Sequence, residues 1–127
     1  MRALAPVVLA CLAPTVLAAC GSDDGSPPAA RSPNTVVMTD YEYHPSDLQV
    51  RRGQTIAVVN EGGIAHNLKV ERGPNPREQS DELAGTSSFL KGDSERLRLD
   101  LPPGRYVMVC TVPGHREIGM TGTITVR

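Results

Sequence analysis

The sequence predicts an all-β domain at residues 34–127, built as a two-sheet β-sandwich of seven or eight short strands. Three observations predict this fold class. Residues 96–101 (Arg-Leu-Arg-Leu-Asp-Leu) alternate strictly between charged and apolar, which is the period of a strand with one buried face. The chain contains 12 Gly and 11 Pro, which suits many turns between short strands. Short β-branched segments also recur between turn signals, as in a sandwich.

The expected strands include residues 36–38, 48–50, 54–60, 96–101, 105–110 and 121–127. Two of them, 54–60 and 105–110, are β-branched and follow a glycine. Turn signals rich in Gly, Pro, Ser and Asp separate them at 44–46, 52–53, 61–63, 91–93 and 102–104. Residues 73–89 are polar and rich in Pro, Ser and Glu, which is compatible with a loop, a short helix at 77–83 or an edge strand.

Residues 1–19 read as an export signal rather than as part of the domain. A basic start, Met1-Arg2, precedes an apolar run that is too short and too broken by proline for a good membrane-spanning helix. The run ends in Leu17-Ala18-Ala19-Cys20, which resembles the lipobox of bacterial lipoproteins. This resemblance implies that Cys20 is lipidated and becomes the new N-terminus. The alternative is an ordinary signal peptide cut near Ala19, with Cys20 incidental.

Residues 20–33 are expected to be a flexible tether, because residues 21–33 contain no apolar side chain larger than Ala or Pro. The domain would then sit outside the cytoplasm, held by a lipid on Cys20 at the outer face of the bacterial cytoplasmic membrane.

Charge and cysteine content restrict the possible functions. Lys and Arg total 13 and Asp and Glu total 14, a formal net charge of −1. This balance argues against nucleic acid as a partner, which normally requires a basic excess. Of the three cysteines, Cys11 and Cys20 belong to the N-terminal segment. Cys110 therefore has no partner for a disulfide within the domain and is either an inert buried thiol or a metal ligand.

The segment Cys110-Thr-Val-Pro-Gly-His115-Arg-Glu-Ile-Gly-Met120 places three potential metal ligands on one connection between two expected strands. The ends of such a loop come together, so Cys110, His115 and Met120 can converge, and His66 lies beside another strand end. One thiolate, two imidazoles and one thioether form the donor set of blue copper electron-transfer sites. Zinc is disfavoured, because structural zinc sites prefer several cysteines. Met38 and Met108 do not fit this spacing and are expected in the core, and His44 is expected in a turn.

Residues 35–127 resemble the plastocyanin/azurin-like cupredoxins, which are blue (type 1) copper proteins. The likeness rests on the pair His66-Asn67, the C-x4-H-x4-M loop and the terminal Gly-Thr-Ile-Thr-Val strand. The loop spacing is similar to that of auracyanin and rusticyanin. The resemblance implies a Greek-key sandwich, the cupredoxin fold.

The same resemblance implies one copper ion that alternates between Cu(I) and Cu(II). Its ligands would be His66, Cys110 and His115, with Met120 in the axial position. Asn67 and Thr111 would link the two ligand-bearing loops and hold the ligands in place.

The function implied by this family is the transfer of single electrons between redox partners, without enzymatic activity. His115 would be partly exposed and would be the port at which a monomeric domain meets its partners transiently. The charges of Arg116 and Glu117 argue against a purely apolar docking face.

Three other functions compete. An extracytoplasmic copper storage or delivery protein would use the same ligands. A copper oxidase or nitrite reductase would need more histidines, and only His44 is left over. A structural or sensory module would not need the intact ligand set.

Overall fold

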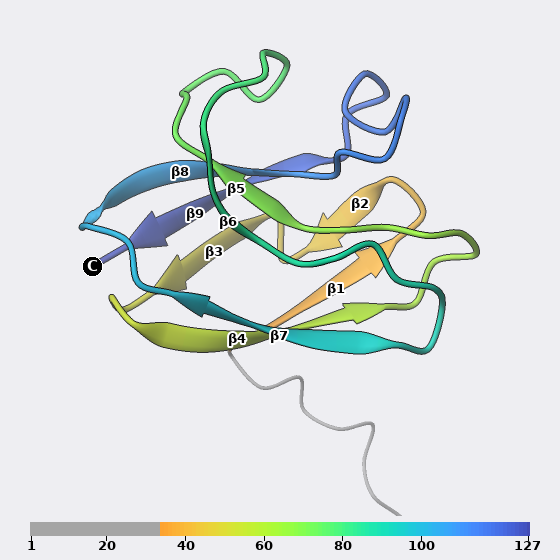
Figure 1. The fold of residues 1–127 in the computed structure, drawn as a ribbon, viewed down its shortest axis with the longest axis horizontal. Helices are drawn as coiled ribbons and strands as arrows, with labels where there is room; N and C mark the ends of the chain where they lie inside the picture. The colour runs from red at the N-terminus through yellow and green to blue at the C-terminus, as the bar shows by residue number, and fades with distance from the viewer. Residues whose placement is uncertain (1–33) are drawn as a thin grey trace, which may run out of the picture.

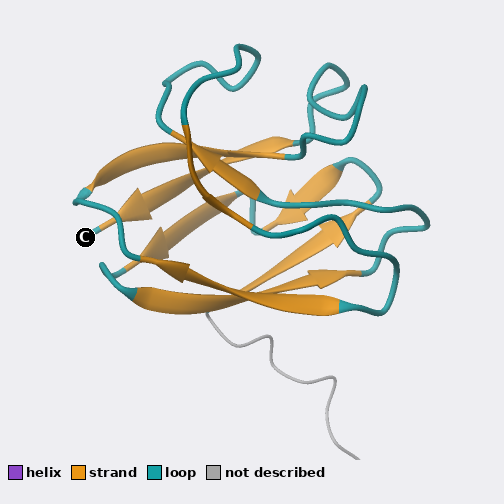
Figure 2. Ribbon diagram, in the orientation of Figure 1, coloured by secondary structure: helices purple, strands orange, loops and turns teal. Residues whose placement is uncertain are grey.

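Nine β-strands form two sheets in the computed structural model, which describes residues 34–127 (Figures 1 and 2). The strands are β1 (Thr35–Thr39), β2 (Glu42–His44), β3 (Asp47–Val50), β4 (Gln54–Asn60), β5 (Lys69–Glu71), β6 (Glu82–Gly85), β7 (Ser94–Leu99), β8 (Gly104–Val109) and β9 (Thr121–Val126). Within residues 34–127 no helix is long and apolar enough to cross a membrane. The predicted signal peptide (1–19), the lipidated Cys20 and the tether (20–33) lie outside the described residues.

The predicted two-sheet sandwich is confirmed. One sheet has the strand order β2-β1-β4-β7 and the other the order β3-β9-β8-β5-β6. Two neighbouring pairs, β1 with β4 and β3 with β9, are parallel, and the remaining pairs are antiparallel. The structure has one strand more than the upper expectation, because β2, β5 and β6 are only three or four residues long. Such short strands leave little alternation in a sequence.

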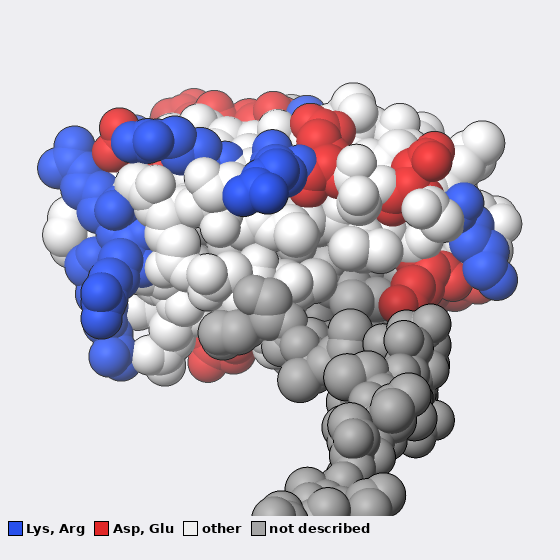
Figure 3. Space-filling model, turned by 90° about the horizontal axis from the view of Figure 1, so that it is seen from below, with Lys and Arg blue, Asp and Glu red and all other residues white. Residues whose placement is uncertain are grey.

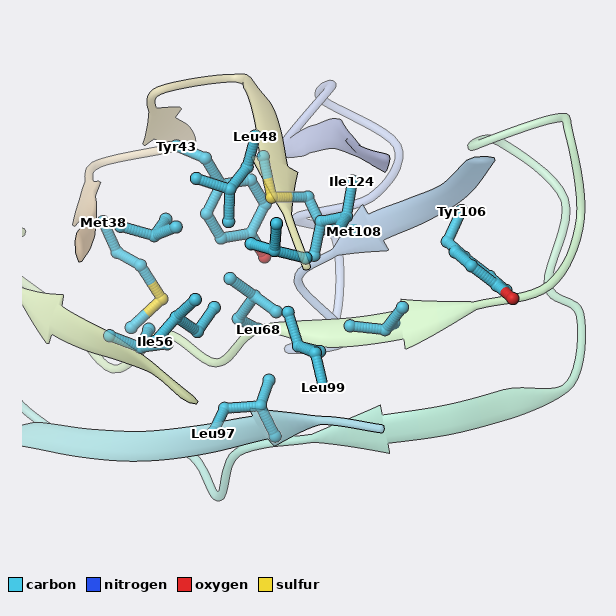
Figure 4. Close-up of a cluster of buried hydrophobic side chains, with 14 of the residues drawn as sticks. Met38, Tyr43, Leu48, Ile56, Leu68, Leu97, Leu99, Tyr106, Met108 and Ile124 are labelled. Carbon is cyan, nitrogen blue, oxygen red and sulfur yellow. The ribbon is translucent and has the colours of Figure 1, made fainter. Parts of the chain in front are cut away.

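The core lies between the two sheets (Figure 4). The alternation at 96–101 places Leu97, Leu99 and Leu101 inside, with exposed fractions of 8%, 0% and 8%. Met38 and Met108 are fully buried in the same cluster, which confirms them as core residues. Apolar contacts therefore hold the two sheets together, and two of the expected metal ligands, Cys110 and Met120, belong to the same core cluster.

Residues 73–89 form a loop followed by an edge strand, and no helix forms at 77–83. β6 pairs with β5 at the edge of the five-stranded sheet, with a register shift between Val70 and Glu71. Side chains close the loop: the Ser80 hydroxyl accepts the Gly73 N–H at 2.8 Å, and the Ser80 N–H donates to Glu71 at 3.2 Å. These side-chain hydrogen bonds take the place of the backbone hydrogen bonds that a helix would have formed.

The strand directions bring several connections to one end of the sandwich, on the right of Figure 1. β1 and β4 are parallel neighbours, so Asp40 and Asn60 leave the sheet at the same end. β8 ends and β9 begins there too, because the two are antiparallel neighbours. The turn between β1 and β2, the connection between β4 and β5, and the loop between β8 and β9 therefore meet.

Candidate metal centre

The four predicted ligands lie on two of these connections. His66 stands in the β4–β5 connection, where its backbone exchanges hydrogen bonds with Phe89 at 3.1 and 3.3 Å. Cys110 directly follows β8, and Met120 directly precedes β9. The Cys110 N–H donates to the Met120 carbonyl at 3.1 Å, and the Met120 N–H donates to the His115 carbonyl at 2.9 Å. These two bonds fold the loop back so that its three candidate ligands cluster.

Three donor atoms face one another in a buried space. His66, Cys110 and His115 are 0%, 0% and 6% exposed, and their donor atoms lie within 4.8 Å of one another. The two Nδ1 atoms are 3.2 Å apart, and the Cys110 Sγ lies 3.3 Å from the Nδ1 of His115 and 4.0 Å from that of His66. Met120 is fully buried and belongs, with Cys110, to the hydrophobic core cluster. The arrangement is a triangle of two imidazole nitrogens and one sulfur.

This triangle has the size that a metal ion requires. A point equidistant from atoms at these separations lies about 2.1 Å from each of them, close to the ~2.0–2.3 Å of metal–imidazole and metal–thiolate bonds. Two imidazoles and one thiolate in a plane, with a thioether as the weak fourth donor, suit copper in both of its oxidation states. The residues present therefore fit a single copper ion.

In the metal-free chain, the pKa shifts favour a neutral imidazole at His115, which can bind a metal, and a protonated thiol at Cys110. Burial lowers the pKa of His115, and the neighbouring His66 lowers it further. His115 is therefore a neutral ligand at neutral pH. Burial raises the pKa of Cys110, although hydrogen bonds from the backbone N–H groups of Asn67 and Val112 act in the opposite sense. Because the thiol is protonated in the metal-free chain, metal binding would release its proton, and the two N–H groups would favour the resulting thiolate.

Hydrogen bonds connect Asn67 to Thr111. The Asn67 amide accepts the Thr111 N–H at 2.9 Å and donates to the Thr111 hydroxyl at 3.0 Å and to the Ser88 hydroxyl at 2.9 Å. Asn67 thereby joins the connection that carries His66 to the residue after Cys110. The fixed amide holds the two loops, and with them the ligands, at one separation.

We expect Asn67→Ala to destabilise the metal-free protein by about 1–3 kcal/mol, because the Thr111 N–H would lose its acceptor in a part-buried position. Chemical denaturation measures the change. The exposed side chain of Asn75 accepts one local hydrogen bond, from the Arg77 N–H, so Asn75→Ala is a matched control with an effect of about 0.5 kcal/mol or less. Equal losses in the two variants would contradict the bridging role of Asn67.

Two residues beneath and beside the cluster were not expected from the sequence. The buried Tyr43 hydroxyl donates to the Asn67 carbonyl at 2.7 Å, and burial raises its pKa well above the usual value. Asp40 Oδ1 lies 3.2 Å from the His66 Nε2, and this contact lowers the pKa of Asp40. Both residues belong to the β1–β2 hairpin. The first strand of this hairpin pairs in parallel with β4, and no local sequence motif predicts that pairing.

The Arg116 side chain turns inward instead of charging the surface around His115. Its guanidinium pairs with Glu71, with nitrogen–oxygen distances of 3.0 and 2.5 Å, and donates to the carbonyls of Pro76 and Glu78 at 3.2 Å. The side chains of Arg116 and Glu71 are 12% and 4% exposed. Arg116 therefore adds no free charge to the surface beside His115, because the buried Glu71 neutralises it, whereas Glu117 is exposed.

Two further expectations differ from the structure. His115 is 6% exposed and not partly exposed, because the Tyr41 ring packs edge-on against it at a centroid distance of 5.1 Å. His44 ends β2 and is followed by a cis peptide bond to Pro45. Its Nε2 lies 3.2 Å from the Thr39 hydroxyl and 3.3 Å from Glu42, so His44 is outside the cluster.

Comparison with known proteins gives a consistent result. Residues 31–127 match the model of a family described as copper binding proteins, plastocyanin/azurin family. The chain is 28% identical over 115 residues to the copper-resistant cuproprotein CopI of Rubrivivax gelatinosus, covering 78% of this chain and 70% of that protein. It is 32% identical over 101 residues to auracyanin-B of Chloroflexus aurantiacus, covering 73% of this chain. The chain spans only 42% of the length of auracyanin-B.

Solved structures show the same likeness. The crystal structure of dithionite-reduced auracyanin from Roseiflexus castenholzii superposes with a TM-score of 0.62 at 25% identity, over 73% of this chain and 94% of that one. The described residues thus share their fold with almost the whole of that auracyanin chain.

Proposed function

Because the chain belongs to the plastocyanin/azurin family of copper-binding proteins, we propose that it carries single electrons between redox partners through one bound copper ion. The observation that carries this proposal is the buried triangle of the two Nδ1 atoms and the Cys110 sulfur. This donor set, with a thioether beside it, is that of blue copper electron-transfer sites.

In this proposal His66 and His115 would hold the copper ion through Nδ1, Cys110 would hold it through Sγ, and the Met120 thioether would be the weak fourth donor. The copper ion supplies the one-electron chemistry. The chain holds the four ligands at nearly fixed positions through the Asn67 bridge and the backbone bonds of the loop. A donor set that suits both oxidation states, held rigidly, needs little rearrangement when an electron enters or leaves.

Redox partners would dock transiently at the end of the sandwich that carries His115. Three large apolar side chains are exposed on the connections there: Tyr41 (41%), Ile64 (42%) and Ile118 (60%). Lys and Arg side chains gather on the left of Figure 3, at the end of the sandwich that carries the C-terminus in Figure 1. Arg51, Arg52 and Arg127 line one cavity. Docking at the copper end would therefore combine a small apolar area with the exposed charge of Glu117, which favours short-lived encounters of a monomer.

Copper storage or delivery is the second candidate. The likeness to the copper-resistant cuproprotein of Rubrivivax gelatinosus favours it specifically. Such a protein could use the same ligands, and it would differ from a carrier in releasing copper to an acceptor.

An enzymatic role is not proposed. Copper oxidases and nitrite reductases use additional copper sites, and in the described residues His66, Cys110 and His115 are the one group suited to hold a metal ion. The remaining histidine, His44, contacts Thr39 and Glu42. We also propose that the chain is exported and held by a lipid on Cys20 at the outer face of the cytoplasmic membrane, as its N-terminal sequence indicates.

Cycling the copper-loaded protein between ascorbate and ferricyanide, with a strong Cu(I) chelator present in the reduced phase, tests the carrier against the delivery protein. A carrier keeps its copper over repeated cycles, because the reduced site needs no rearrangement. Stoichiometric loss of copper to the chelator in the first reduced phase would assign the protein to copper delivery.

A further inference from the structure

We propose that Asp40 is a positioning residue for the copper site: its carboxylate fixes the ring of His66 with Nδ1 toward the metal and strengthens binding of Cu(II). The inference rests on the proposed copper site and adds a residue that neither the ligand spacing nor the family comparison assigns.

The contact involves the side of the His66 ring that faces away from the ligand cluster. Asp40 Oδ1 lies 3.2 Å from the His66 Nε2, whereas the His66 Nδ1 lies 3.2 Å from the Nδ1 of His115. A carboxylate only accepts hydrogen bonds, so it requires the proton of a neutral imidazole on Nε2. The lone pair is then on Nδ1, where a metal ion would be bound.

Two glycines beside the Asp40 carboxylate, Gly62 and Gly63, make this contact possible. The Gly63 N–H donates to Asp40 Oδ1 at 2.8 Å. A Cβ atom on Gly62 would lie 2.7 Å from Asp40 Oδ1 and 2.8 Å from the His66 Nε2, closer than real Cβ contacts allow. The Gly62-Gly63 pair therefore leaves the space in which the two groups meet and supplies one donor that orients the acid.

The backbone at the next residue supports the same arrangement. Tyr41 has a φ of 70°, in the left-handed region that a residue with a side chain seldom adopts. In this conformation its ring meets His66 and His115 edge-on, with centroid distances of 6.2 and 5.1 Å. The turn thus directs Asp40 to one face of the cluster and the Tyr41 ring across both imidazoles. Strained backbone of this kind is typical of functional sites.

The expected consequence concerns the oxidised ion more than the reduced one. A carboxylate that accepts the outer N–H of a metal-bound imidazole fixes the tautomer and makes the ring a stronger donor. Cu(II) gains more from a stronger nitrogen donor than the softer Cu(I) does. In Asp40→Asn the amide could instead donate to Nε2, which would place the ring proton on Nδ1, where it blocks the metal.

The test compares full-length wild type, Asp40→Asn and Asp40→Ala by chelator competition for Cu(II) and, separately, for Cu(I). We expect both variants to lose about 10- to 100-fold in Cu(II) affinity and less in Cu(I) affinity, so that the reduction potential rises. Glu42→Gln is the matched control: it removes the same charge two residues away, from a side chain that is 70% exposed and contacts His44. Unchanged Cu(II) affinity in Asp40→Asn, or an equal loss in Glu42→Gln, would overturn the proposal.

A second readout needs no copper. Nitrogen NMR of the metal-free wild type should find the His66 proton on Nε2, and Asp40→Ala should mix the two tautomers. The same mixture in wild type would overturn the role of Asp40. If wild type took up no copper, the copper site itself would fail, whereas the tautomer measurement would still decide on the contact between Asp40 and His66.

Discussion

Replacing Cys110 by serine should remove the blue colour of the copper-loaded protein. The colour of such sites arises from the bond between copper and a thiolate, and Cys110 is the one cysteine within residues 34–127. A serine hydroxyl stays protonated where a thiol loses its proton on metal binding. We expect copper affinity to fall further than the ~10–100-fold typical for a residue outside the ligand set. Visible spectroscopy and a copper titration measure both effects.

Met108→Leu is the control for this variant, because Met108 is also a fully buried sulfur residue and lies on β8, the strand that leads to Cys110. It should keep the colour unchanged. A blue Cys110→Ser protein, or a colourless Met108→Leu protein, would contradict the assignment of Cys110 as the thiolate.

Among the polar side-chain contacts of the domain, loss of the Arg116 guanidinium should lower the free energy of unfolding most. The side chain of Glu71 is 4% exposed, and Arg116→Met removes the cation that pairs with it. Breaking one partner of a buried pair typically destabilises by about 3–5 kcal/mol. Chemical denaturation of the metal-free protein measures the loss. The more exposed pair of Lys69 and Glu82, 3.0 Å apart, offers the comparison: Glu82→Gln should cost about 0–1 kcal/mol.

The double variant Glu71→Gln/Arg116→Met tests the cause. Without the buried charge it should be more stable than Arg116→Met alone. If the single variant unfolded at the same denaturant concentration as wild type, the ion pair would contribute nothing measurable.

The same pair predicts how stability depends on pH. Burial alone would raise the pKa of Glu71, but the hydrogen bonds from Arg116 and from the Ser80 N–H outweigh it, so the pKa is lowered from 4.5. The unfolded chain therefore takes up this proton at a higher pH than the folded chain. The contribution of Glu71 is complete above about pH 4.5 and is lost as the pH falls through the lower folded value. Glu71→Gln should show a shallower loss of stability in acid than wild type.

Much of the fold could be predicted because it depends on local patterns. The period of two at 96–101 identifies β7 and the side of it that is buried, and the glycine-bounded segments identify β4 and β8. β6 is only one of three possibilities for residues 73–89, because Glu82–Gly85 has no alternating pattern and becomes a strand through its pairing with β5. Local patterns thus predict strands that bury one face, and they miss strands that form only by pairing with a neighbouring strand.

The residues of the candidate site likewise fall into those that a local pattern predicts and those that only long-range pairing brings to the site. Cys110, His115 and Met120 are close in sequence, so their convergence follows from one loop between neighbouring strands. Asp40 and Tyr41 reach the site because β1 runs parallel to β4, a long-range pairing that carries no short motif. The inward turn of Arg116 likewise depends on Glu71, which is 45 residues away. Residues that support a site from distant segments are therefore the ones that spacing alone leaves out.

The measurement that tests the central claim most directly is a titration of the full-length, metal-free protein with Cu(II), followed by visible absorption. We predict an intense band that reaches its maximum at one copper per chain, bleaches with ascorbate and returns with ferricyanide. Tight copper binding without that band would contradict the claim that Cys110, His66 and His115 hold copper as a thiolate electron-transfer site.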